Sequence, residues 1–212
     1  MTAIELSSEV GLVAVGLATS NICLGLLIAG RYSPVRFWPH RRINIFAIHT
    51  WSAYLLLASI LLHPMILMFS GFRRFRLIDI VFPVWSPGQP VKNSVGAAGL
   101  VLLLVVVITS FFRLSLGRRI WKGFHYLVYA AALSVFIHST LEDPTLRGMP
   151  VDFLDGEKIF VEFCGCAVVG CTLLALRYRL AHKLPSRGTS SGETERSRVG
   201  EVRREAGLRQ WR

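Results

Sequence analysis

The chain has 212 residues, of which 52% are hydrophobic and only 17% charged, and its mean hydropathy is +0.49. This composition is too apolar for a soluble domain of that length and indicates a membrane protein. A formal charge of +11 would suggest a nucleic-acid partner in a soluble protein. Here the basic residues flank apolar stretches, so we interpret the charge as a topology signal and expect no nucleic-acid partner.

Five apolar stretches approach or exceed the roughly 20 residues that cross the hydrocarbon core. In chain order we place them at residues 10–29, 43–69, 94–112, 121–141 and 159–176. The sequence therefore predicts an all-α, polytopic membrane helix bundle of about five transmembrane helices. The first stretch has no basic segment before it and no small-residue cleavage site after it, so we expect an uncleaved anchor.

The distribution of charge predicts the orientation of these helices. Basic residues dominate the segments after the first, third and fifth stretches: Arg31, Arg36, Arg41, Arg42, Arg113, Arg118, Arg119, Lys122, Arg177, Arg179 and Lys183. Acidic residues mark the N-terminus and the fourth loop: Glu5, Glu9, Glu142, Asp143, Asp152, Asp155 and Glu157. By the positive-inside rule we predict the N-terminus outside and the C-terminus inside. Arg73, Arg74 and Arg76 run against this assignment, but three segments outweigh one.

The chain divides into a membrane domain, residues 1–184, and a polar tail, residues 185–212. The tail is too poor in large apolar residues to bury a core, so we expect a disordered basic cytoplasmic segment. The loop at residues 71–93 is rich in Pro and Gly and should be mostly irregular, with a short interfacial piece around residues 77–82.

Four histidines in two of the stretches carry the chemical signal. His49 and His63 lie in the second stretch, and His125 and His138 in the fourth. Histidine is costly inside a bilayer and rarely stands there without a partner. Fourteen residues of ideal helix put the first pair about 21 Å apart and only about 40° off one face. The second pair lies about 20 Å apart but about 140° around an ideal helix, so it needs curvature, a π-bulge or a special rotamer.

Because the second and fourth stretches cross the membrane in the same direction, His49 should lie at the depth of His125, and His63 at that of His138. Two imidazoles at each of two depths indicate two haem irons with both axial positions filled, which favours electron transfer. The alternative is four structural histidines in a haem-free scaffold or transporter. His40 and His182 lie in polar segments and are given no ligand role.

Aromatic and basic neighbours are weaker candidates. Six aromatic residues could pack on porphyrin faces or simply between helices: Trp51, Tyr54, Phe124, Tyr126, Tyr129 and Phe136. Propionates of an inner haem could pair with Arg41, Arg42, Arg118, Arg119 or Lys122, and those of an outer haem with Arg73 or Arg74. The positive-inside rule accounts for these basic residues equally well.

Two segments resemble the ferric reductase-like transmembrane domain. One is Arg118-Arg119-Ile-Trp121-Lys-Gly-Phe-His125-Tyr-Leu-Val-Tyr129, followed by His138; the other comprises Arg41-Arg42, His49 and His63-Pro64. The family includes ferric reductases and the membrane part of NADPH oxidases. Its members hold two b-type haems between two helices with the same spacings of fourteen and thirteen. The resemblance covers roughly residues 10–180 and implies that His49 and His125 ligate an inner haem b, and His63 and His138 an outer haem b.

The resemblance also implies partners. Typical members have six spans and continue into cytosolic FAD and NADPH domains, whereas this sequence lacks the first span and ends in a short tail. We therefore expect no catalytic residue in the chain itself, but an oxidoreductase component of a bacterial inner membrane. It would take electrons from a separate cytoplasmic flavin reductase and pass them to a ferric chelate, dioxygen, a quinone or a periplasmic redox protein outside. A second interpretation is a subunit feeding a periplasmic reductase, as in the bacterial methionine sulfoxide reductase system, whose haem subunit shares the Trp-x-x-x-His segment.

Overall fold

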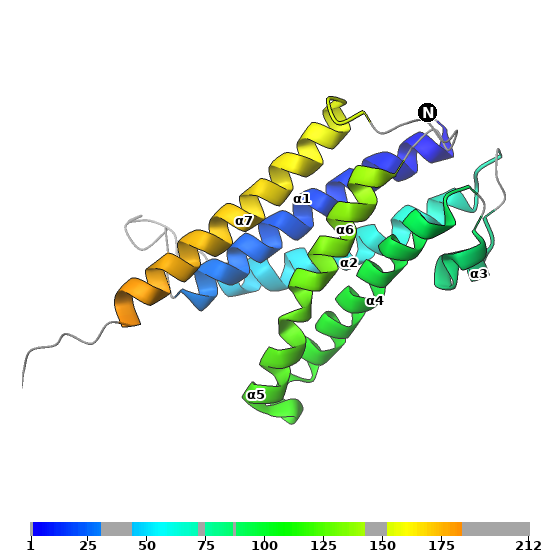
Figure 1. Cartoon of the computed structure of the whole chain (residues 1–212). Coiled ribbons are helices and arrows are strands. Elements are labelled where there is room, and N and C mark those ends of the chain that lie inside the picture. Colours follow the sequence, from blue (N-terminus) through cyan, green and yellow to red (C-terminus); the bar gives the residue numbers. More distant parts are fainter. Residues whose placement is uncertain (1, 31–43, 72–74, 87, 143–151, 184–212) are drawn as a thin grey trace, which may run out of the picture. The chain divides into compact units, whose positions relative to one another are not determined.

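The computed structural model describes residues 2–30, 44–71, 75–86, 88–142 and 152–183. Every regular element in these ranges is helical, so the predicted all-α class is confirmed (Figure 1). Five helical segments are long and apolar enough to span a membrane: Ala3–Ala29, Ile45–Leu67, Pro90–Phe111, Arg113–Leu141 and Gly156–Ala181. The chain is therefore an integral multi-pass membrane protein. Residues 1–175 form one compact unit, and the packing discussed below lies within it.

Helix α1 (Ala3–Ala29) begins seven residues before the predicted start at residue 10. Its first turn is stabilised by a capping box: the Glu5 amide donates to Thr2 Oγ1 at 3.2 Å, and the Thr2 amide donates to Glu5 Oε2 at 2.8 Å. Helix α2 (Ile45–Leu67) starts after Asn44, whose side chain accepts the Ala47 amide at 3.1 Å, and runs through Pro64. Hydropathy locates apolar stretches, but the caps decide where these helices begin.

The loop predicted at residues 71–93 is more ordered than expected. Helix α3 (Leu77–Val81) lies where a short interfacial piece was predicted, and the 3-10 turn η2 (Pro83–Trp85) follows it. Helix α4 (Pro90–Phe111) begins at Pro90, a position where the missing amide proton costs no helical hydrogen bond. Proline, which we took as a sign of irregular structure, here starts two helical segments.

The predicted basic loop before the fourth span is also helical. Helix α5 (Arg113–His125) contains Arg118, Arg119 and Lys122, and it bends at Gly117, whose φ of 74° suits glycine. Helix α6 (Leu127–Leu141) follows directly after Tyr126, which joins it to α5 and keeps helical backbone angles of φ −70° and ψ −15°. Helix α7 (Gly156–Lys183) starts in the compact unit of residues 1–175.

The junction at Tyr126 bears on the angular mismatch between His125 and His138. The Tyr129 amide donates to the Tyr126 carbonyl at 3.1 Å, three residues back rather than four. Such a tightened turn advances about 120° per residue instead of about 100°. Overwinding in this direction turns His138 toward the face that carries His125, which an ideal helix cannot do.

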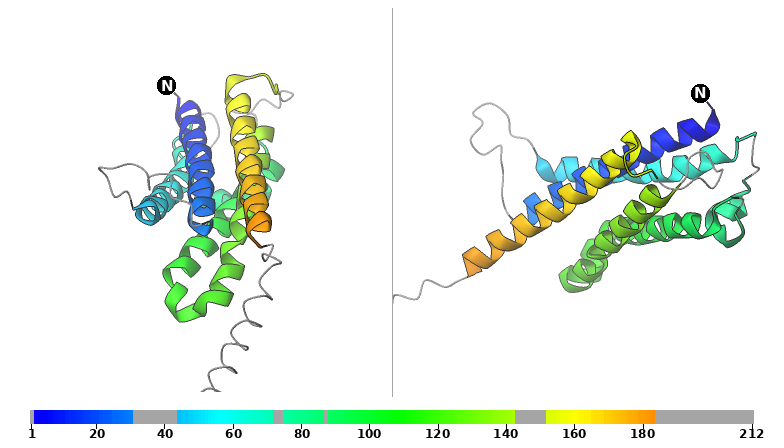
Figure 2. Two further views of the ribbon diagram at one scale, coloured as in Figure 1. Left: turned by 90° about the vertical axis from the view of Figure 1, so that its left-hand side faces the viewer. Right: turned by 45° about the horizontal axis from the view of Figure 1, so that its top comes forward.

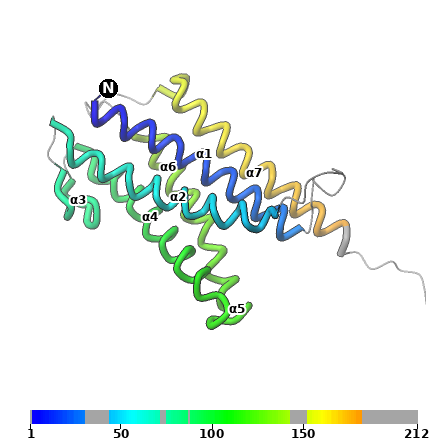
Figure 3. Tube along the Cα trace, turned by 180° about the vertical axis from the view of Figure 1, so that it is seen from behind, coloured from blue at the N-terminus to red at the C-terminus, as the bar shows by residue number. Residues whose placement is uncertain are grey.

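The core of the unit consists of two antiparallel helical hairpins, α1 with α2 and α4 with α6 (Figure 2). Helix α2 packs along α1 and also contacts α4, as the view from behind shows (Figure 3). In the described part of the chain, the backbones of α2 and α6 make no extended contact with each other. The two histidine-bearing helices are thus held apart by the helices that support them.

A buried apolar layer separates the two histidine levels. Ala14, Ala18, Leu56 and Leu103 pack together there, and Leu56 is seven residues from both His49 and His63. Ala131 and Ala132 are buried at the corresponding height of α6. Helix α7 packs onto α1 and α6 through two further clusters, one around Val15, Val161 and Cys164 and one around Ile22, Ala132 and Val168.

Candidate functional site: two facing histidine pairs

The structure brings the four histidines together as the two pairs that equal depth predicts. The ring centroids of His49 and His125 lie 6.3 Å apart, with an angle of 70° between the ring planes. Those of His63 and His138 also lie 6.3 Å apart, at 74°. One hairpin supplies one member of each pair and the other hairpin supplies the second. The role of these rings as iron ligands stays a prediction.

The separation of the rings indicates what each pair can hold. A direct hydrogen bond between two ring nitrogens would bring the centroids to about 5 Å. One metal ion bonded at about 2 Å to a nitrogen of each ring instead puts the centroids about 6 Å apart. Each pair therefore leaves room for one metal ion between its two rings.

His49 and His63 are held by two polar residues of α1. A ligating imidazole normally donates its second ring N–H to an acceptor, which fixes the tautomer and the ring orientation. His49 Nδ1 lies 3.1 Å from the Asn21 carbonyl oxygen, and His63 Nδ1 lies 2.7 Å from the Ser7 carbonyl oxygen. With Nδ1 donating in both rings, Nε2 keeps its lone pair for a metal ion.

The same two residues of α1 return hydrogen bonds to the histidine backbone. Ser7 Oγ donates to the His63 carbonyl at 2.8 Å, and Asn21 Nδ2 donates to the His49 carbonyl at 2.7 Å. Asn21 Nδ2 also donates to Ser52 Oγ at 2.7 Å. Ser7 and Asn21 are only 1% and 7% exposed, so their polar atoms need these partners. Each therefore holds both the ring and the backbone of one histidine.

His138 is supported in the same way by α4. Its Nδ1 lies 2.8 Å from the Lys92 carbonyl oxygen. The Glu142 carboxylate, one turn further along α6, lies 3.7 Å from the same nitrogen. Lys158 of α7 donates to the carbonyls of Ser139 and Glu142, each at 2.7 Å, and so caps the last turn of α6 beside His138.

Three glycines make these ring-to-carbonyl contacts possible. In a helix, the side chain at position i+4 lies near the carbonyl of residue i, which is why serine there can hydrogen-bond it. Gly11, Gly25 and Gly96 stand four residues after Ser7, Asn21 and Lys92. A Cβ on Gly96 would lie 3.0 Å from His138 ring atoms, one on Gly11 would lie 3.1 Å from His63 Nδ1, and one on Gly25 would lie 3.3 Å from His49 Cε1. A side chain at any of these positions would push the imidazole off its acceptor.

His125 has a different partner. Its Nδ1 lies 3.4 Å from Ser110 Oγ, a side-chain oxygen rather than a carbonyl. Trp121 donates to the same oxygen at 3.3 Å, and its ring centroid lies 5.1 Å from that of His125. All four histidines thus have an acceptor for Nδ1 among the described residues, which the sequence alone could not identify.

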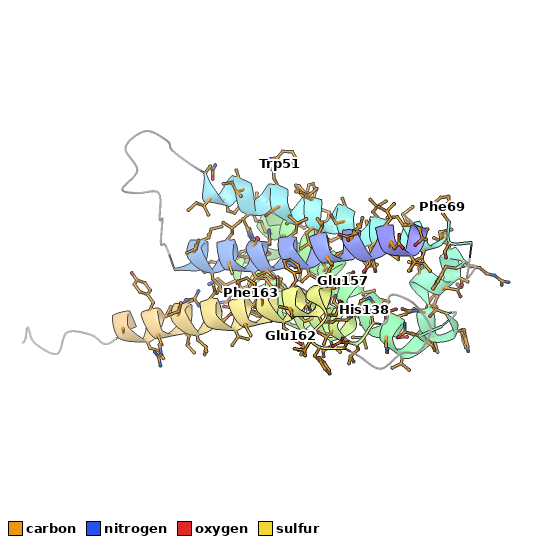
Figure 4. The ribbon with its side chains drawn as sticks, turned by 90° about the horizontal axis from the view of Figure 1, so that it is seen from above. Trp51, Phe69, His138, Glu157, Glu162 and Phe163 are labelled. Atoms are coloured by element: carbon orange, nitrogen blue, oxygen red, sulfur yellow. The ribbon has the colours of Figure 1, made fainter. Side chains whose placement is uncertain are left out.

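A cavity with an empty volume of about 1120 Å³, including its open mouth, lies at the level of His63 and His138. Both rings line it, together with Gly11 and Gly96 and a largely apolar wall. Asp79, Glu142, Glu157 and Lys158 also line it, and Figure 4 labels His138 and Glu157.

Each site offers two protein ligands. Among the described residues, no group of three or more His, Cys, Asp or Glu side chains is placed to hold a metal ion. This donor set does not match the four-ligand sites of structural zinc. Two opposed imidazoles fit a metal ion whose remaining ligands come from a planar macrocycle, which is the chemistry of bis-histidine haem.

The structure describes only some of the other basic, histidine and aromatic residues that the sequence singled out. Arg41, Arg42, Arg73 and Arg74, together with His40 and the tail of residues 185–212, lie outside the described residues. Arg118, Arg119 and Lys122 are exposed on α5, and their pairing with propionates stays a prediction. Among the aromatic candidates, Trp51 is 72% exposed and Tyr126 58% exposed, whereas Phe136 packs in the core with α1 and α7.

Sequence reasoning missed the residues that support the histidines: Ser7, Gly11, Asn21, Gly25, Lys92, Gly96 and Ser110. One signal could have found some of them. Gly11 and Gly25 are fourteen residues apart, as are Ser7 and Asn21, and this matches the spacing of His49 and His63 on the antiparallel neighbour. Glycines repeating at the ligand spacing inside an apolar helix indicate a close approach by the ligands.

Comparison with known protein families gives one match. The model described as "Ferric reductase like transmembrane component" matches residues 14–136, which include His49, His63 and His125. His138 lies two residues beyond the matched range. The comparison with curated proteins and the comparison with solved structures each give no match.

Proposed function

The chain belongs to the ferric reductase-like transmembrane family, and on this basis we propose that it carries electrons across a membrane through two b-type haems. His49 and His125 would hold the inner haem, and His63 and His138 the outer one. When bound, the haems supply two one-electron carriers at different depths. The observation that carries the proposal is the pair of facing imidazoles at each level, 6.3 Å apart in both cases.

The protein's own residues have three tasks in this function. His49 with His125, and His63 with His138, would each hold one haem iron with two imidazoles, which favours electron transfer over the binding of small ligands at iron. Ser7, Asn21, Lys92 and Ser110 fix the tautomer of the rings by accepting from Nδ1. The apolar layer around Leu56 and Leu103 excludes water between the two levels.

Direction and partners form the finer part of the proposal. Positive charge on α5 and in neighbouring segments supports an inner side at the His49–His125 level. Electrons would enter there from a cytoplasmic flavin reductase and leave at the His63–His138 level. The cavity at the latter level is where an outer acceptor would approach most closely. A ferric chelate, dioxygen, a quinone and a periplasmic redox protein are the candidate acceptors.

Vesicles that contain the purified protein and an enclosed, impermeant ferric acceptor test this function. A membrane-impermeant reductant added outside should reduce the enclosed acceptor in proportion to the haem content. The His138→Ala variant should lose this reaction, and protein-free vesicles should not show it. Equal rates with wild-type protein, with the variant and without protein would overturn the proposal.

A further inference from the structure

The support of His138 by α4 is not repeated at the other histidine level. Fourteen residues after Lys92 and Gly96, which support His138, the same helix carries Val106 and Ser110. Ser110 replaces the glycine, so a side chain stands where the ring would need open space. His125 therefore lacks the carbonyl acceptor that the other three histidines have in the described structure.

The Ser110 hydroxyl takes the place of the carbonyl acceptor, and two donor groups share it. Ser110 Oγ lies 3.4 Å from His125 Nδ1 and accepts from Trp121 Nε1 at 3.3 Å. The indole lies over the imidazole, with centroids 5.1 Å apart and planes tilted by 31°. If His125 ligates through Nε2, its Nδ1 carries the proton, so the hydroxyl oxygen accepts from two donors. Two donors on one neutral oxygen give two long, weak hydrogen bonds.

We propose that Ser110 and Trp121 are positioning residues that set the reduction potential of the inner haem by sharing one hydroxyl oxygen between indole and imidazole. The inference rests on the proposed function, because it assumes that His49 and His125 hold a haem. It goes beyond that function because it assigns different hydrogen-bond partners to the ligating histidines of the two haem sites. At the outer level, the Nδ1 atoms lie 2.7 and 2.8 Å from carbonyl oxygens, and His63 Nδ1 also lies 3.0 Å from Ser7 Oγ. At the inner level, the carbonyl contact of His49 is 3.1 Å and the hydroxyl contact of His125 is 3.4 Å.

The chemical reason lies in the basicity of the ligand. The redox step adds one electron to Fe(III) to give Fe(II), without forming or breaking a bond. A stronger hydrogen bond from Nδ1–H makes the imidazole a more basic ligand, which favours Fe(III) and lowers the potential. Ser110 strengthens that bond by accepting it, and Trp121 weakens it by competing for the same oxygen. The two residues should therefore act on one haem in opposite directions.

A redox titration of the haem spectrum, resolved into two midpoint potentials, tests this inference on the purified full-length protein. Ser110→Ala removes the acceptor, so one midpoint should rise. Trp121→Phe keeps an aromatic ring but removes the competing donor, so the same midpoint should fall. Ser110→Thr keeps the hydroxyl and should stay close to wild type. The second midpoint should not move in any of the three variants.

Trp51→Phe is the matched control. Trp51 lies on α2, two residues after His49, but its side chain is 72% exposed and projects away from the bundle (Figure 4). This control should leave both midpoints unchanged. Shifts of the same sign in Ser110→Ala and Trp121→Phe, or no shift in either with two haems bound, would overturn the inference and leave the proposed function standing. A wild-type protein without haem would instead remove the proposed function and the inference with it.

Discussion

At the scale of single residues, the site depends on three glycines, which have no side chain and so leave room for the histidine rings. Gly11, Gly25 and Gly96 let three imidazoles reach carbonyl oxygens of neighbouring helices. Glycine in a helix costs about 0.5–1 kcal/mol relative to alanine, so its presence at three contact points needs a reason. Room for the ligand rings supplies that reason.

Gly96→Ala should therefore damage the outer site although alanine favours a helix. A methyl group there would lie 3.0 Å from three atoms of the His138 ring, closer than side-chain atoms normally approach. We expect loss of one haem per chain, or a clear change in its low-spin spectrum, measured on the purified protein. Gly165→Ala on α7 is the control, because a Cβ there meets nothing within 4 Å. Equal spectra for the two variants would contradict the assigned role of Gly96.

Substitutions of Ser7 and Asn21 should each weaken a different one of the two histidine levels. Ser7→Ala removes the hydrogen bond to the His63 backbone, and Asn21→Ala removes those to the His49 backbone and to Ser52. Leaving a buried group without its partner costs about 1–3 kcal/mol, so both variants should unfold at lower temperature. Haem release on heating should begin with the outer haem in Ser7→Ala and with the inner haem in Asn21→Ala. The same order of release in both variants would count against the separate roles.

At the scale of elements, each ligand helix has its own supporting helix. Helix α1 supports α2 at two heights fourteen residues apart, and α4 supports His138 of α6 through Lys92 and His125 of α5 through Ser110, eighteen residues further along. The five apolar spans and the pairing of the histidines could be predicted from composition and spacing alone. The helix starts could not, because capping by Thr2 and Asn44 and the role of Pro90 depend on local hydrogen bonds.

The geometry of the junction between α5 and α6 could not be predicted from the sequence either. Nothing in a hydropathy pattern shows that the helical turn after Tyr126 tightens. The sequence could only state that thirteen residues do not bring His125 and His138 to one face. The acceptors of the four Nδ1 atoms were also out of reach, because they are backbone carbonyls and a serine on other helices. Such contacts depend on which helices pack together, and spacing within one helix does not reveal that.

An insertion tests the angular relation within α6. One alanine inserted between Ala131 and Ala132 would rotate His138 by about 100° and shift it by about 1.5 Å relative to His125. We expect the purified variant to keep the inner haem and lose the outer one. An alanine inserted after Ser70, outside the helices that carry and support the ligands, should leave both haems bound. Two haems in the α6 insertion variant would show that the register of α6 does not position the outer ligand.

At the scale of the whole membrane unit, each histidine pair joins one ring from α2 to one ring from the α5–α6 segment. Among the described residues, these helices pack against α1 and α4 and make no extended contact with each other. A buried apolar layer lies between the two histidine levels. This arrangement explains why four polar side chains are tolerated inside apolar helices, since each has a hydrogen-bond acceptor behind it and room for a metal ion in front.

The most direct test is a haem count on purified wild-type protein and on the His138→Ala variant, combined with oxidised and reduced optical spectra. The wild-type chain should carry two low-spin haems, and the variant should carry one. A wild-type preparation that stays colourless when produced in cells rich in haem would contradict the account, and so would a variant that retains both haems.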